Sequence, residues 1–239
     1  MCTSNHKPFH FKQFSIFHHS STMKVGTDAI LIGVWCDTND ASFILDVGTG
    51  SGIIALLIAS RSKANIHAIE LDEASVKEAK VNFNNFSGNK LTVIHDNFIN
   101  FAGNTKQKYD LIVSNPPFFV NSLLPDKKSR IAARHTQSLS HNQLCKGVTS
   151  LLSNNGKFCI VLPYDVAISF ISIANEFNLH LHKQLIIYPK PKTNPNRINM
   201  EFRLKKPSSV IVDEITIRNI DGIHSFKYKN YVNDYLIKI

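Results

Sequence analysis

Apolar and polar positions alternate in blocks along the chain, with short apolar runs separated by stretches of helical periodicity. Apolar runs of about four to eight residues are typical of strands that are buried on both faces of a parallel sheet. We predict five such strands, over residues 43–47, 65–71, 91–94, 109–114 and 157–162. The helical patterns predict helices over residues 53–60, from residue 73 onward, over 140–152 and near 164–177.

The ends of these elements carry recognisable signals. Asp72 and Ser140 are of the residue types that cap helix N-termini. The run Asn154-Asn155-Gly156 indicates the end of the helix that begins at Ser140, and Pro163 ends the strand that follows. Regular alternation of strands and helices predicts a parallel sheet covered by helices on both faces and joined by right-handed crossovers.

After residue 179 the rhythm changes, and residues 179–188 and 198–204 predict two longer strands. The Pro/Lys-rich segment 189–197 joins them, so we expect an antiparallel hairpin at the sheet edge, followed by a strand within 209–218 and a short helix within 228–237. The predicted fold class is α/β, a Rossmann-like doubly wound and mostly parallel sheet with an antiparallel edge hairpin. We expect one domain over residues 1–239, with 1–40 as an N-terminal extension and 41–239 as the core.

Composition and charge narrow the class of protein. With 43% hydrophobic and 19% charged residues among 239, the chain can bury an ample core. Its net charge of +9 fits an ordinary basic protein or a polyanionic partner such as nucleic acid, and charge alone does not choose between them. The longest apolar stretch, residues 53–59, is far below the roughly 20 residues that span a bilayer. We therefore expect a cytoplasmic protein without a membrane partner.

Metal and disulfide chemistry are not expected. The cysteines show no Cys-x-x-Cys spacing, and the N-terminal histidines have no carboxylate or cysteine nearby in the sequence that completes a zinc-ligand pattern. The residues concerned are Cys2, Cys36, Cys145 and Cys159, and His6, His10, His18 and His19.

A glycine-rich loop, Asp46-Val47-Gly48-Thr49-Gly50-Ser51-Gly52, follows the first predicted strand. A doubly wound sheet places its ligand loop at this position, and glycine lets the backbone approach a ligand closely. The third glycine comes one residue earlier than in the dinucleotide fingerprint, which suits a zwitterionic amino-acid tail better than a pyrophosphate. Glu70 and Asp96 follow the next two strands, where they can bond ribose hydroxyls and an adenine edge. A tight turn without ligand is the alternative interpretation, and these acids argue against it.

This pattern resembles the class I methyltransferases, and the resemblance implies the cofactor S-adenosylmethionine. It also implies that the loop wraps the methionine part, that the acid at Glu70 holds the ribose and that the acid at Asp96 contacts the adenine amino group. The expected cofactor-binding residues in this part of the chain are Asp46, Gly48, Thr49, Gly50, Gly52, Glu70, Leu71, Asp96, Asn97 and Asn115.

The run Ser114-Asn115-Pro116-Pro117-Phe118 follows the fourth predicted strand, so it lies at the same sheet edge. An amino group on an aromatic ring is a poor nucleophile because its lone pair is delocalised. The Asn115 side-chain oxygen and the Pro116 carbonyl can accept its two N–H bonds and aim the lone pair, which is catalysis by positioning and electrostatics. The ring of Phe118 can stack on a base that has been flipped out. We expect Asn115, Pro116, Pro117 and Phe118 to be catalytic.

Taken alone, such a run is more often a turn that closes a strand. It resembles the [Asn/Asp/Ser]-Pro-Pro-aromatic motif of amino-methyltransferases, which act on adenine, cytosine, guanine or glutamine amide nitrogen. The motif indicates methyl transfer to a planar amino group but does not identify the acceptor molecule.

From about residue 11 to residue 239 the chain resembles the bacterial tRNA1(Val) adenine methyltransferase family, which modifies the N6 amino group of the adenine 3′ to the anticodon. The resemblance rests on residues 11–14, 23–28, 114–119, 133–136, 139–141, 156–158, 162–163 and 231–236. It implies tRNA as partner, and a cofactor lid over 23–32 in which Lys24, Thr27 and Asp28 reach the cofactor. Ribosomal RNA or a protein glutamine amide is the alternative acceptor, although we expect neither a duplicated domain nor an N-terminal helical domain here.

Basic residues bear on the acceptor as well. One group follows the Asn-Pro-Pro run closely and another lies in the predicted hairpin segment, where both can flank the pocket; scattered surface charge is the alternative interpretation. The expected substrate-binding residues are Phe118, Phe119, Lys127, Lys128, Arg130, Arg134, His135, Lys190, Lys192 and Arg197. His135 and His141 are expected to be structural or substrate-positioning, because the chemistry needs no base. We expect a monomer.

Overall fold

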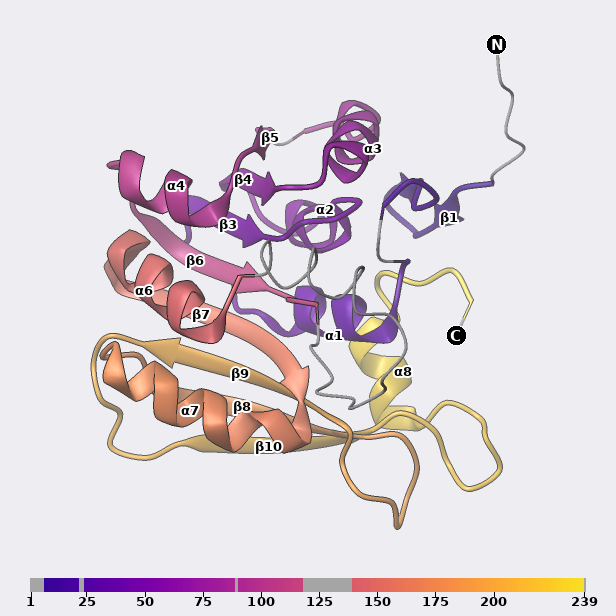
Figure 1. Cartoon of the computed structure of the whole chain (residues 1–239). Helices are drawn as coiled ribbons and strands as arrows, with labels where there is room; N and C mark the ends of the chain where they lie inside the picture. Colours follow the sequence, from indigo (N-terminus) through magenta and orange to yellow (C-terminus); the bar gives the residue numbers. More distant parts are fainter. Residues whose placement is uncertain (1–6, 22–23, 89, 118–138, 239) are drawn as a thin grey trace, which may run out of the picture.

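The computed structural model describes residues 7–21, 24–88, 90–117 and 139–238. Its centre is an eight-stranded sheet with the order β10-β8-β9-β7-β6-β3-β4-β5 (Figure 1). The strands are β3 (Phe43–Val47), β4 (Asn65–Glu70), β5 (Leu91–His95), β6 (Tyr109–Ser114), β7 (Leu152–Pro163), β8 (His180–Tyr188), β9 (Arg197–Arg203) and β10 (Ile211–Thr216). A two-stranded antiparallel sheet of β1 (Phe9–His10) and β2 (Ser15–Ile16) precedes them.

The strand directions bring most of the loops that follow strands to one edge of the sheet. Strands β5, β4, β3, β6 and β7 pair in parallel, β9 is antiparallel to both β7 and β8, and β10 is parallel to β8. Because the direction reverses into β9 and reverses again into β8, every strand of the large sheet except β9 ends at the same edge. We call this the carboxyl edge, the place where doubly wound sheets bind ligands.

Helices cover both faces of the sheet, as predicted. The helices are α1 (Thr27–Trp35), α2 (Ile53–Ala59), α3 (Glu73–Asn84), α4 (Phe98–Asn104), α6 (His141–Leu151), α7 (Ala167–Glu176) after a 3-10 turn (Tyr164–Val166), and α8 (Phe226–Val232). Ile44 packs with α1, α2 and α8 in one apolar cluster, and Leu45 packs with α6 and α7 in the other. The side chains of neighbouring strand residues thus point to opposite faces of the sheet. Because both faces are covered by apolar clusters, the strands are continuous apolar runs.

Two boundaries in the second half of the chain differ from the prediction. Helix α6 ends at Leu151, and β7 begins at Leu152, before the Asn-Asn-Gly run that we expected to stop the helix. That run lies inside β7, where the register with β6 shifts between Tyr109 and Leu111 and the extra residues form an irregularity. The hairpin of β8 and β9 is confirmed, but the edge strand is β10.

Four elements had no clear signal in the sequence. Helix α1 is buried on nearly every side, so it lacks the one-sided apolar stripe of a surface helix. Helix α4 is short, and its cap Asn97 was assigned to the cofactor instead. The strands of the β1–β2 pair have two residues each, too few for a period to be recognised.

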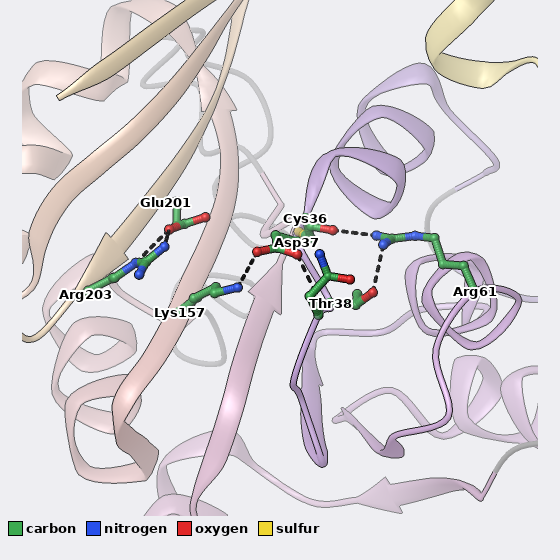
Figure 2. Close-up of polar contacts among 8 residues, drawn as sticks. Cys36, Asp37, Thr38, Arg61, Lys157, Glu201 and Arg203 are labelled. Atoms are coloured by element: carbon green, nitrogen blue, oxygen red, sulfur yellow. Dashed lines mark hydrogen bonds and ion pairs between the residues drawn. The ribbon is translucent and has the colours of Figure 1, made fainter.

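Polar contacts anchor the C-terminal end of α1 (Figure 2). The guanidinium of Arg61 donates to the carbonyls of Gly33 at 2.8 Å and Cys36 at 2.6 Å, and to the Thr38 hydroxyl at 2.9 Å. Lys157 of β7 forms an ion pair with Asp37 at 2.5 Å. The two bonds from Arg61 to Gly33 and Cys36 satisfy carbonyls that a helix end leaves open. The N-terminal end of α1 is thereby directed along β7 toward the carboxyl edge.

Among the described residues, none of the helices combines the length and the apolar character that crossing a bilayer requires.

Candidate active site

The glycine-rich loop, residues 46–52, has an open side and a packed side. Gly48, Gly50 and Gly52 have φ of 73°, 56° and 90°, in the left-handed region that favours glycine. A Cβ at Gly48 or Gly50 would meet no atom within 4 Å, whereas one at Gly52 would lie 2.5 Å from Cε1 of Phe83. The first two glycines therefore border an open cradle, and the third packs the loop against α3.

Asp46 is fully buried at the base of this loop. Its Oδ2 accepts a hydrogen bond of 2.6 Å from the Thr49 hydroxyl, and its Oδ1 has no partner among the described residues. Burial raises the pKa of Asp46 to about 7, although bonds from Thr49 and the Ala55 N–H lower it, and the charge of Glu70 raises it further. A buried carboxylate oxygen with no donor suits a positively charged amino group at the open side of the loop.

The raised pKa of Asp46 predicts a pH-dependent stability. Its pKa is about 7 in the folded chain against 3.8 as the ordinary value, so between these pH values the folded state holds a proton that the unfolded chain has released. The contribution of Asp46 to stability therefore falls as pH rises through this window. We expect Asp46→Asn to raise the unfolding free energy of the ligand-free protein at pH 8 by on the order of a few kcal/mol, and by much less at pH 5. Urea unfolding at both pH values measures this.

Asp110 provides the matched control. Burial raises the pKa of Asp110, but bonds from the Ser42 and Phe43 N–H groups and the Ser153 hydroxyl outweigh burial and lower it. Its stabilisation is present above pH 3.8 and is lost only as pH falls below that value, so Asp110→Asn should destabilise equally at pH 5 and pH 8. An Asp46→Asn effect that is equal at both pH values would contradict a neutral Asp46 at low pH.

Glu70 and Asp96 stand at the carboxyl edge, as expected, but both also bind backbone. Glu70 Oε2 accepts the Gly50 N–H at 2.9 Å, and Oε1 accepts the N–H groups of Leu71 at 2.8 Å and Asp72 at 2.9 Å. Asp96 Oδ1 accepts the N–H of its neighbour at 2.7 Å. Carboxylate oxygens accept more than one bond, so ribose and adenine binding by these acids stays a prediction. The sequence did not indicate that Glu70 ties the glycine loop to the end of β4.

The two other residues expected beside the adenine differ in their surroundings. Asn97 caps α4 by accepting the Ile99 N–H at 2.8 Å through Oδ1, which occupies the side-chain oxygen. Leu71 is exposed at the end of β4.

The Asn-Pro-Pro run begins where β6 ends, directly beside β3. The Ser114 hydroxyl donates to the Val47 carbonyl at 2.9 Å, which joins this run to the strand that leads into the glycine loop. Asn115 is 8% exposed, and its Oδ1 is buried with no partner among the described residues. Pro116 is buried and Pro117 is exposed. The structure thus brings the two predicted motifs together at one edge and leaves one acceptor oxygen in each without a donor.

A cavity of about 260 Å³ lies next to Asn115. Its lining comes from the N-terminal segment, from the start of β9 and from the end of β10: Lys24, Gly26, Thr27, Asp28, Ala29, Asn115, Asn196, Arg197 and Ile217. All three residues expected in the cofactor lid therefore face the same space as Asn115.

Two of these lining residues pair with each other. Asp28 was expected to bind cofactor and Arg197 to bind substrate, and Asp28 Oδ2 accepts a bond of 2.7 Å from Arg197 Nε. The Lys24 ammonium donates to the carbonyls of His18 at 3.0 Å and His19 at 3.2 Å. The lid segment is therefore joined to the β8–β9 hairpin across the cavity.

Two polar residues of α3 fasten the N-terminal segment beside the glycine loop, and sequence reasoning missed both. Asn82 accepts the Phe17 N–H and donates to the carbonyls of Phe17 and Ser51, each at 2.8 Å. Glu78 accepts the N–H groups of residues 19–21 at 2.7 to 2.9 Å. Burial raises the pKa of Glu78, but these donors outweigh burial and lower it. In the sequence they appear only as two polar residues four positions apart, a spacing that places them on one face of the helix.

The remaining predicted residues fall into three sets. Lys190 and Lys192 are exposed on the loop between β8 and β9 and are not among the residues that line the cavity. His141 packs edge-on against Phe170 with ring centroids 5.1 Å apart, and burial lowers its pKa, which fits the structural interpretation. The others lie outside the described residues: Phe118, Phe119, Lys127, Lys128, Arg130, Arg134 and His135. Within the described part of the chain no group of three His, Cys, Asp or Glu residues could hold a metal ion.

Comparison with known proteins identifies relatives over nearly the whole chain. Residues 15–180 match the family model of the methyltransferase small domain. A curated tRNA1(Val) (adenine(37)-N6)-methyltransferase of Bacteroides thetaiotaomicron is 38% identical over 97% of this chain and 98% of its own length. The protein of the same name from Photorhabdus laumondii is 36% identical over 96% of this chain and 95% of its own length.

Solved structures share the fold at low identity. A "predicted O-methyltransferase" from Agrobacterium tumefaciens is 14% identical with a TM-score of 0.63, over 87% of this chain and 95% of its own. A methyltransferase from Pyrococcus furiosus is 18% identical with a TM-score of 0.59, over 80% of this chain and 89% of its own. These likenesses confirm the predicted class I methyltransferase fold.

Proposed function

Because the chain belongs to the family of the tRNA1(Val) (adenine(37)-N6)-methyltransferases, we propose that it methylates the N6 amino group of an adenine in a tRNA anticodon loop. The position is the adenine 3′ to the anticodon, and the tRNA is valine tRNA. The observation that carries the chemistry is the buried, unpartnered Oδ1 of Asn115, a residue that lines the cavity.

The enzyme uses S-adenosylmethionine, which supplies an electrophilic methyl group when it is bound. The residues at the carboxyl edge fit this cofactor. The unpartnered Oδ1 of Asp46 can accept the amino group of its amino-acid tail, and the open side of Gly48 and Gly50 leaves room for that tail. Glu70 and Asp96 would hold the ribose and the adenine.

Asn115 would hold the acceptor base. Its Oδ1 accepts one N–H bond of the exocyclic amino group, and the Pro116 carbonyl accepts the other. These two acceptors favour a pyramidal nitrogen, whose lone pair then points at the methyl donor instead of into the ring. The hydrogen bond from Ser114 to Val47 ties the end of β6 to β3, which would hold these acceptors in position before the base arrives.

The nature of the acceptor follows from the family and is supported by charge. The relatives named after tRNA1(Val) match this chain over nearly its full length and theirs. The chain carries a net charge of +9, which favours a polyanionic substrate. The exposed Lys190 and Lys192 lie on a loop at the carboxyl edge, from which they can reach phosphates.

Incubation with unmodified valine tRNA and labelled S-adenosylmethionine, followed by nucleoside mass spectrometry, tests the proposal. We expect one N6-methyladenosine per tRNA, and none in a tRNA that carries guanine in place of the adenine 3′ to the anticodon. Ribosomal RNA and a glutamine-containing peptide serve as competing acceptors. Methylation of either of them, with valine tRNA left unmodified, would contradict the tRNA assignment.

A further inference from the structure

Residues 217–225 connect β10 to α8 at the carboxyl edge, and we call them the β10–α8 loop. Ile217 lines the same cavity as Asn115. Its N–H donates to the Tyr188 carbonyl at 2.8 Å, and the N–H of Arg218 donates to the Pro189 carbonyl at 3.1 Å. This loop, yellow in Figure 1, therefore begins beside the orange loop between β8 and β9.

The β10–α8 loop has a defined internal structure. The Asn219 N–H donates to the Ile223 carbonyl at 2.7 Å, and the Arg218 guanidinium donates to the Gly222 carbonyl at 2.7 Å. Ser225 then caps α8 through its hydroxyl. Side chains on the outside of this loop are therefore held in place by backbone contacts.

Large apolar side chains point outward from this structured loop. Ile220 is 77% exposed, Ile223 is 57% exposed, and Phe226, the first residue of α8, is 79% exposed. Single exposed apolar residues are common, but three within seven positions, on a loop whose first residue lines the cavity, indicate a surface that binds a partner.

Cations surround these apolar side chains. Arg218 and Lys229 both act on His224, whose pKa is lowered by burial first and then by these two charges. Lys190 and Lys192 are exposed on the adjacent loop. Positive charge therefore converges on this part of the carboxyl edge from two loops and from α8.

The nearby acids do not cancel this charge. Asp213 forms an ion pair with Lys227 at 2.7 Å, so these two residues compensate each other. Asp221 Oδ1 accepts the Ile223 N–H at 3.1 Å within the loop. Glu214 contacts the Tyr188 hydroxyl at 3.4 Å, and among the described residues of these two loops and the end of β10 the cations Arg218, Lys190 and Lys192 outnumber the carboxylates of Asp221 and Glu214.

We propose that the β10–α8 loop and the first turn of α8 form a second RNA-contact surface, on which an unpaired base next to the target stacks on Phe226 while Arg218 and Lys229 bind the flanking phosphates. Aromatic and apolar side chains interleaved with cations are the chemistry by which proteins hold single-stranded nucleic acid. This inference rests on the proposed function. The residues of this surface are separate from those expected to bind the cofactor or to be catalytic. The proposal also explains why large apolar side chains of this loop are exposed and not packed in the core.

Phe226→Ala tests the stacking contact. The Phe226 side chain is almost free of the core, so the variant should fold normally and keep its affinity for S-adenosylmethionine. We expect its affinity for valine tRNA, measured by fluorescence anisotropy, to fall about 5- to 100-fold. Lys229→Glu should weaken binding as well, and should lower the dependence of affinity on salt concentration because fewer counterions are released.

Two control variants match these changes in exposure and in charge. Ile211 at the start of β10 is 62% exposed and lies at the edge opposite the carboxyl edge, so Ile211→Ala removes a similar apolar group away from the proposed surface. Lys63 is exposed just before β4, at the edge opposite the carboxyl edge, so Lys63→Glu repeats the charge change there. Both controls should bind valine tRNA as the unmodified protein does.

The outcomes separate this inference from the proposed function. If the unmodified protein neither binds nor methylates valine tRNA, the proposed function fails, and this inference fails with it. If the protein methylates valine tRNA but Phe226→Ala and Lys229→Glu bind it as tightly as the controls do, this inference alone is wrong. A change in oligomeric state on Phe226→Ala, with unchanged RNA affinity, would assign the surface to a protein contact and overturn the inference.

Discussion

Replacing Asn115 by leucine is expected to lower the rate of methyl transfer by about 10²- to 10³-fold while leaving the fold intact. Leucine has the same branched arrangement of side-chain heavy atoms as asparagine, although its methyl groups are larger, and it offers no acceptor for the amino group of the base. Asn115 is buried and its Oδ1 has no partner among the described residues, so burying this oxygen costs stability in the ligand-free protein. Leucine removes that cost but adds larger methyl groups to a buried site, so we expect the variant to fold with a stability within about 1–3 kcal/mol of that of the unmodified protein.

Three measurements separate this result from simple damage to the protein. Thermal unfolding reports stability, calorimetry with S-adenosylmethionine reports cofactor binding, and single-turnover kinetics with valine tRNA report the chemical step. Asn115→Asp keeps an acceptor oxygen and should recover part of the activity that Asn115→Leu loses. If Asn115→Leu were destabilised and had lost cofactor affinity together with activity, the residue would be structural and the proposed role would be wrong.

A loss of activity without a loss of stability is typical of functional sites. A buried polar group that binds the ligand there lowers the stability of the ligand-free protein. Asp46 shows the same feature at the other motif, with a buried oxygen that no described residue bonds. The sequence indicated both positions through residue type and spacing. It did not indicate that each has an unmet hydrogen bond, because that depends on which groups the folded chain brings near.

The central strands could be predicted because burial on both faces leaves a continuous apolar run, as in β3 and β6. The position of β10 at the edge of the sheet could not be predicted from the sequence. Its sequence mixes exposed Ile211 and Val212 with Asp213 and Glu214, and a strand paired on one side only is constrained by few neighbours. The consequence is functional, because the parallel pairing of β10 with β8 brings the β10–α8 loop to the carboxyl edge.

The contacts of the N-terminal segment could not be predicted from local sequence patterns, for a different reason. Glu78 and Asn82 bind residues 17–21, which lie more than fifty positions earlier in the chain. Spacing within α3 shows that two polar residues share a helix face, but it does not show what covers that face. The cofactor lid was expected from resemblance, and the structure adds the physical contacts that hold its leading segment against α3.

The second large effect is expected from Gly52→Ala, which should lower the unfolding free energy by about 2–5 kcal/mol. At φ of 90° an alanine is strained, by about 1–2 kcal/mol. Its Cβ would also lie 2.5 Å from Cε1 of Phe83, which is 6% exposed and has little room to move. Displacing that ring from the core of α3 adds about 1–3 kcal/mol. Urea unfolding of the ligand-free protein measures the sum.

Gly48→Ala and Gly50→Ala are matched controls for this effect, because both positions have positive φ but a Cβ there meets nothing within 4 Å. They should cost only the backbone strain, about 1–2 kcal/mol each, yet weaken S-adenosylmethionine binding because the added methyl group enters the cradle. The double variant Gly52→Ala/Phe83→Leu removes the ring and should be less destabilised than the two single changes added together. If Gly52→Ala cost no more stability than the two controls, the contact with Phe83 would not hold the loop, and the division of the loop into a packed side and a ligand side would be wrong.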